Sequence, residues 1–128
     1  MIKRFLSLER LDKGWTARLK RVRRSGLRTQ TDESLTLCTE QFLANSLFRY
    51  LSDAEDTAWV RARAIACVLA WWLVQTVALL EANDAPLEMQ NPLFAAVVEA
   101  ARAFSCEVDY SQKNLDRLFA FAYQFVKI

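Results

Sequence analysis

The side chains with the clearest chemical potential in this sequence are basic ones that share one face of a single expected helix. At 3.6 residues per turn, five of them fall within one arc of a helix over about residues 7–25: Arg10, Lys13, Lys20, Arg21 and Arg24. Arginine carries a planar guanidinium that donates two parallel hydrogen bonds to a carboxylate or a phosphate. This face is therefore predicted to contact an anionic surface.

The distribution of charge along the chain supports this prediction. The chain has 17 basic and 15 acidic residues, a net charge of only +2. Residues 1–28 hold ten basic and two acidic residues, and the other 100 hold seven basic and thirteen acidic ones, so a segment of net charge +8 precedes one of −6. Such asymmetry favours a local surface that meets an anion.

Several partners could use this face, and the sequence leaves the choice open. An acidic protein surface is the first expectation, with ordinary solvated surface charge as the plain alternative. Nucleic acid would be bound through its phosphates alone, because neither interleaved aromatic residues nor a helix-turn-helix pattern accompanies the arginines. An anionic membrane is the third alternative.

No residue pattern points to catalysis, a metal or a cofactor. The chain has no histidine, and its two glycines, Gly14 and Gly26, do not form a phosphate-binding loop. Its three cysteines, Cys38, Cys67 and Cys106, are widely spaced, so neither a zinc site nor a disulfide framework is expected. Cys106, in a predicted loop, is the cysteine to test for reactivity. We expect a non-enzymatic protein without metal or cofactor, in a reducing, cytoplasmic setting.

Large apolar side chains suggest a second surface. The chain has eight phenylalanines and four tryptophans, and a small domain has a limited interior. The surplus is expected to form a patch that pairs two copies of the chain or receives a partner, with a well-filled core as the alternative. The candidates, which fall partly off the main apolar stripes, are Phe94, Phe104, Phe121 and Tyr123.

Helices must position these residues, because the sequence lacks the turn residues typical of a β fold. After Gly26 it has no glycine and only two prolines, Pro86 and Pro92. Apolar spacing predicts five helices, over about residues 7–25, 32–51, 54–82, 92–104 and 111–126, with a break at 105–110. Asn91 followed by Pro92 is the sharpest boundary, a helix cap before a proline at the first helical position.

The expected helix over about residues 54–82 is apolar on all sides. Between residues 64 and 80 the only polar side chains are Gln75 and Thr76. Such a helix must be surrounded by other helices or by lipid. These 17 residues are at the lower limit for spanning a bilayer, and two adjacent tryptophans would lie at mid-depth, away from the interface that tryptophan prefers. A buried core helix is favoured.

The sequence thus predicts one all-α domain over residues 1–128, a bundle of about five helices around a long hydrophobic central helix. We expect it to act through protein–protein interaction, as a small intracellular accessory, regulatory or inhibitory protein. In this hypothesis the basic N-terminal helix docks on an acidic partner surface. Nucleic-acid binding by the same helix is the first alternative, and membrane association is the second.

Overall fold

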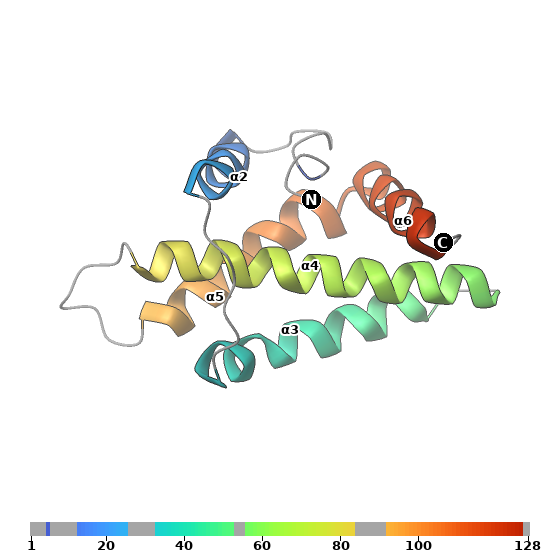
Figure 1. Ribbon diagram of the computed structural model, residues 1–128, viewed down its shortest axis with the longest axis horizontal. Helices are drawn as coiled ribbons and strands as arrows, with labels where there is room; N and C mark the ends of the chain where they lie inside the picture. Colours follow the sequence, from blue (N-terminus) through green and yellow to red (C-terminus); the bar gives the residue numbers. More distant parts are fainter. Residues whose placement is uncertain (1–4, 6–12, 26–32, 53–55, 84–91, 127–128) are drawn as a thin grey trace.

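The computed structural model is helical over nearly all of the residues that it describes (Figure 1). These are Phe5 and residues 13–25, 33–52, 56–83 and 92–126, and no strand occurs among them. The elements are α2 (Lys13–Ser25), α3 (Glu33–Leu51), α4 (Thr57–Asn83), α5 (Pro92–Phe104), the π-helical turn η1 (Ser105–Asp109) and α6 (Gln112–Val126). The predicted fold class, a helical bundle around a long apolar helix, is confirmed.

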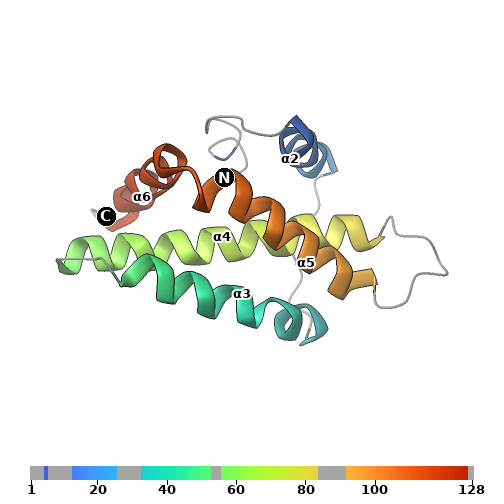
Figure 2. The ribbon, with the colours of Figure 1, turned by 180° about the vertical axis from the view of Figure 1, so that it is seen from behind.

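Helix α4 lies at the centre of the bundle. It packs against α3, α5 and α6, and α2 crosses it near its C-terminal end (Figures 1 and 2). Its residues from Leu73 to Ala78 are all buried, and six consecutive buried residues require neighbours on every side of a helix. Helix α4 is long and apolar enough to cross a membrane, but the core helices of soluble proteins share this length and composition. Of its most apolar 18-residue stretch, 56% is buried inside the bundle.

Buried polar groups fix the position of α3 along α4. The two helices run in opposite directions, and the Thr39 hydroxyl of α3 accepts hydrogen bonds from Trp71 Nε1 at 2.9 Å and Gln75 Nε2 at 3.0 Å, both on α4. The same hydroxyl donates to the Leu35 carbonyl at 2.8 Å. A buried polar group without a partner costs about 1–3 kcal/mol, so sliding α3 along α4 would be costly.

The aromatic core is centred on Phe104, at the C-terminal end of α5. Its side chain is fully buried. Rings from three separate segments meet it edge-on, namely Phe5, Trp15 and Phe42, with centroid distances of 6.3, 6.2 and 5.8 Å. Edge-to-face pairs are a favoured arrangement of aromatic rings. The expectation that Phe104 belongs to a surface patch is therefore wrong, because its ring is enclosed by these neighbours.

The predicted break between the last two helices is wrong for residues 105–109, which continue the helix. Ser105–Asp109 form a π-helical turn directly after Phe104, and the chain turns only at Tyr110. A π-helical turn is wider than an α-helical one and so rotates the residues that follow it. Here it buries Val108 and brings Asp109 to α3, and it places Cys106 on a helical turn instead of in a loop.

The substitution Phe104→Ala is expected to lower the free energy of unfolding by about 3–5 kcal/mol, because it leaves a cavity where four aromatic rings meet. Phe48→Ala is the matched control, since Phe48 is 79% exposed and its loss should change stability by no more than about 0.5 kcal/mol. Urea denaturation followed by circular dichroism measures both variants. Equal losses would contradict the central place of Phe104 in the core.

Candidate functional site

The outer face of α2 carries the predicted basic residues that the structure describes. We define the basic face as its exposed members: Lys20, Arg21, Arg23 and Arg24. Arg23 joins the three that were predicted. The opposite side of α2 is buried against the bundle through Trp15, Leu19 and Val22. Arg10 and the side chain of Lys13 lie outside the described residues, although Lys13 opens α2.

Arg18 is the basic residue of α2 that fastens the helix to the bundle. Its Nε lies 3.1 Å from Glu81 Oε1 on α4, and its Nη2 lies 3.2 Å from Glu99 Oε1 on α5. Burial raises the pKa of Glu81, and the charge of Arg18 opposes this rise. Glu99 is also held by Arg102, whose Nη2 lies 2.6 Å away. Hydrogen bonds from Arg102 and then Arg18 outweigh desolvation and lower the pKa of Glu99 to about 2.

The helix dipole accounts for only part of the basic face. Arg23 and Arg24 lie in the last turn of α2, where cations stabilise the carbonyl end of a helix. Lys20 and Arg21 come before that turn, so the dipole does not explain their positions. In the described part of the chain, no ion pair joins Lys20, Arg23 or Arg24 to another residue. These three cations are therefore accessible to a partner.

The remaining three residues of the predicted apolar patch do not lie together. Phe94, near the start of α5, is 59% exposed. Phe121 and Tyr123 are half-buried on α6, at the other end of α4 (Figure 1). There the Phe121 ring packs edge-on against Phe125 at 5.3 Å, and Tyr123 lies 4.6 Å from Trp59 between ring centroids. The structure thus separates Phe94 from the aromatic pairs that involve α6.

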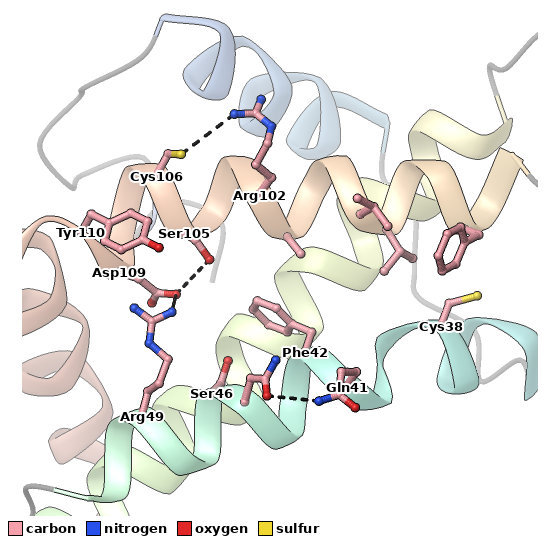
Figure 3. A pocket seen from close by; sticks show the side chains of 15 residues that line it. Cys38, Gln41, Phe42, Ser46, Arg49, Arg102, Ser105, Cys106, Asp109 and Tyr110 are labelled. Atoms are coloured by element: carbon pink, nitrogen blue, oxygen red, sulfur yellow. Dashed lines mark hydrogen bonds and ion pairs between the residues drawn. The ribbon is translucent and has the colours of Figure 1, made fainter.

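Phe94 lines instead an open groove between α3 and α5, where it is the first residue of the α5 wall. Figure 3 shows this groove from close by. The groove has a volume of about 640 Å³. Its walls are formed by residues between 38 and 49 of α3, and by residues between 94 and 110 of α5, η1 and the turn that follows η1. Figure 3 shows Phe42 in the middle, Cys38 toward one end and Arg49 with Asp109 at the other. The groove thus has apolar residues on its α5 wall, polar residues such as Gln41 and Ser46 on its α3 wall, and an ion pair at the η1 end.

A buried carboxylate closes the η1 end of the groove. The Asp109 side chain is 3% exposed and pairs with Arg49 Nη1 at 3.3 Å. It also accepts hydrogen bonds from the Tyr50 hydroxyl and from the Ser105 hydroxyl, the latter at 3.1 Å. These contacts join the C-terminal end of α3 to η1.

Burial shifts the proton equilibria around this carboxylate. It raises the pKa of Asp109 above its ordinary value, and the Tyr50 hydrogen bond and the Arg49 charge oppose the rise. Burial, reinforced by the charge of Asp109, also raises the pKa of Tyr50 and brings the pKa of the Cys67 thiol to about 12. Tyr50 and Cys67 therefore stay protonated at neutral pH, and Tyr50 is a fixed hydrogen-bond donor to Asp109.

The three cysteines are free and lie in different environments. Cys67 is buried in α4, Cys38 is half-buried in the groove wall, and Cys106 is exposed on η1. The sulfur of Cys106 lies 4.0 Å from Arg102 Nη1. Within the described ranges, no group of three or more histidine, cysteine, aspartate or glutamate side chains is placed to hold a metal ion.

Three arginines that shape these surfaces were not predicted. At 100° per residue, Arg23 lies about 60° outside the arc of the predicted basic residues and about 40° from Leu19 in the apolar stripe, so helical periodicity did not group it with them. Arg18 lies at the flank of the apolar stripe, where a long side chain can bridge to neighbouring helices. Arg49 gave no local signal, because its partner Asp109 is 60 residues away in the chain.

The substitution Tyr50→Phe is expected to lower the free energy of unfolding by about 1.5–3 kcal/mol at pH 7, because it removes a donor from a buried carboxylate. The folded-state pKa of Asp109 lies above its unfolded value, so stability falls as the pH rises through that interval. Without the Tyr50 donor this pKa rises further. The deficit of the variant should therefore grow with pH and shrink where Asp109 is protonated.

Chemical denaturation at a series of pH values from about 4 to 7 measures this deficit. Tyr110→Phe is the control, because Tyr110 is 74% exposed and its hydroxyl makes no hydrogen bond to a described residue. A Tyr50→Phe deficit that does not change with pH would contradict the assigned role of Asp109.

No protein-family model matches this chain, and searches of curated proteins and of solved structures also find no match. The surfaces that bear on function are the basic face of α2 and the groove between α3 and α5.

Proposed function

We propose that this chain is a non-enzymatic, intracellular binding protein whose basic face docks on an acidic surface of a partner protein. The supporting observation is the placement of four exposed cations on the outside of a helix whose inner side is buried. Arg18 adds ion pairs from α2 to two other helices. Because the backbone that carries the basic face is already fixed, less conformational freedom is lost when a partner binds.

An acidic protein suits the basic face better than a nucleic acid does. After residue 28 the chain has seven basic and thirteen acidic residues, so a polyphosphate that extended beyond α2 would meet net negative charge. Single-stranded nucleic acids also need aromatic rings on which bases stack. The one aromatic residue of α2, Trp15, is buried on the inner side. A local acidic patch needs only the basic face.

The cysteines support an intracellular setting. All three are free thiols, and free thiols persist in the reducing environment of the cytoplasm. Cytoplasmic location is part of this proposal.

The double substitution Lys20→Glu/Arg24→Glu is expected to abolish partner capture while leaving the fold intact, because both side chains are exposed. It reduces the charge of the basic face from +4 to 0. Arg21 is kept, since it lies near Glu81 and lowers the pKa of that residue.

The measurement has two steps. Tagged protein is first incubated with nuclease-treated extract, and the retained proteins are identified by mass spectrometry. The rate of association with the purified partner is then measured as a function of salt concentration. We expect the association rate constant to fall about tenfold or more in the variant.

The matched control is Arg61→Glu/Arg117→Glu, which changes the net charge equally at exposed positions of α4 and α6. The proposal is supported if wild type and control retain the same acidic protein and the α2 variant does not. Equal retention by all three proteins would overturn it. Binding that is present only before nuclease treatment would assign the basic face to nucleic acid instead.

A further inference from the structure

The groove between α3 and α5 leaves three large apolar side chains exposed, two on α5 and one beyond its C-terminal end. Phe94, the first residue of the α5 wall, is 59% exposed, Val98 in the same wall is 52% exposed, and Tyr110 after η1 is 74% exposed. Contiguous exposed apolar surface on a small protein marks an interaction site when it is shaped and rimmed by polar groups. The groove is separate from the basic face, which lies on α2.

The dimensions of the groove match a short helix. Its α3 wall extends from Cys38 to Arg49, which at 1.5 Å per residue is roughly 16 Å, or about three helical turns. The two wall helices run in the same direction (Figure 2), and residues of both line the groove. An amphipathic helix binds such a groove by inserting apolar residues spaced at i, i+4 and i+7.

The charge that a partner can reach in the groove is positive. The Arg49 side chain is 44% exposed at the η1 end, where its guanidinium lies 5.6 Å from the centre of the Tyr110 ring. Its partner Asp109 is 3% exposed and is turned toward hydroxyl donors, so the acid is shielded and the arginine is not. An acidic side chain at the end of the bound helix complements Arg49.

A macromolecular partner fits these observations better than a small carboxylate does. Small-molecule sites enclose most of their ligand, whereas this groove is open, and Phe94 and Tyr110, the first and last residues of the wall that begins on α5, stand largely in solvent. A ligand that covers both residues must span the groove and extend over its rims. A helix of about three to four turns does so.

We propose that the groove between α3 and α5 binds an amphipathic helix of a partner protein, with its apolar side chains between Phe42 and Val98 and an acidic residue at Arg49. This second binding surface goes beyond the proposed docking of the basic face and does not depend on it.

The proposal is tested with a fluorescein-labelled helical peptide about four turns long, with leucine at i, i+4, i+7 and i+11 and a glutamate at each end of the leucine stripe. Its binding is followed by fluorescence anisotropy against wild type, Val98→Asp and Val68→Asp. The two valines are 52% and 51% exposed, and Val68 lies on α4 outside the groove. We expect a micromolar Kd for wild type and Val68→Asp, and one at least tenfold weaker for Val98→Asp.

The contribution of Arg49 is measured by a double-mutant cycle. Arg49→Gln is expected to weaken binding of the glutamate peptide about two- to fivefold and to leave binding of the same peptide with glutamine at those positions unchanged. The Asp109 carboxylate keeps its hydroxyl donors in this variant. Thermal melts of every variant check that the fold is retained. Equal effects on both peptides would remove Arg49 from the proposal.

Three results would overturn the proposal: no saturable binding by wild type, equal binding of a scrambled peptide, or equal effects of the two valine substitutions. Saturable binding of oleate without binding of the peptide would indicate that the groove binds a small ligand instead. If wild type does not bind the peptide and forms a dimer that the Val98→Asp substitution converts to a monomer, the groove binds a second copy of the chain. The Lys20→Glu/Arg24→Glu variant should bind the peptide as wild type does, which keeps this test independent of the basic face.

Discussion

Helix α4 has apolar side chains on every side, and the need to cover most of them organises the rest of the molecule. Helices α3, α5 and α6 pack along it, and α2 crosses it near its C-terminal end. Each covering helix packs one side against α4 or the core around it, so packing does not dictate the residue types on its other side. The basic face of α2 and the groove between α3 and α5 are both formed by such outward-facing residues.

The elements that burial specifies were predictable from the sequence. The stripe of Trp15, Leu19 and Val22 predicted the buried side of α2, and the polar residues opposite it predicted the basic face. The proline at residue 92 predicted the start of α5, where α5 begins in the structure. Local periodicity was enough to predict these elements, because the spacing of apolar residues within one helix indicates which side of the helix is buried.

The features formed by contacts between distant segments could not be predicted. Arg18 pairs with Glu99, 81 residues away, and Tyr50 binds Asp109, 59 residues away. No local pattern records such pairs. The π-helical turn at η1 was missed for a related reason, since polar and apolar residues between Ser105 and Asp109 resemble a break until α3 supplies partners for Asp109. Phe104 was misplaced because periodicity within α5 does not show which rings of other segments enclose it.

The carboxylate of Glu99 has a consequence for the whole molecule, because it is shared by two arginines. Arg18 holds it from α2, and Arg102 holds it from α5 at the outer edge of the groove. Because one carboxylate pairs with both guanidiniums, the position of α2 against the bundle depends on an acid that is also bound by a residue of the groove wall. Loss of Glu99 would therefore remove a contact of α2 and the ion pair of Arg102 in one step.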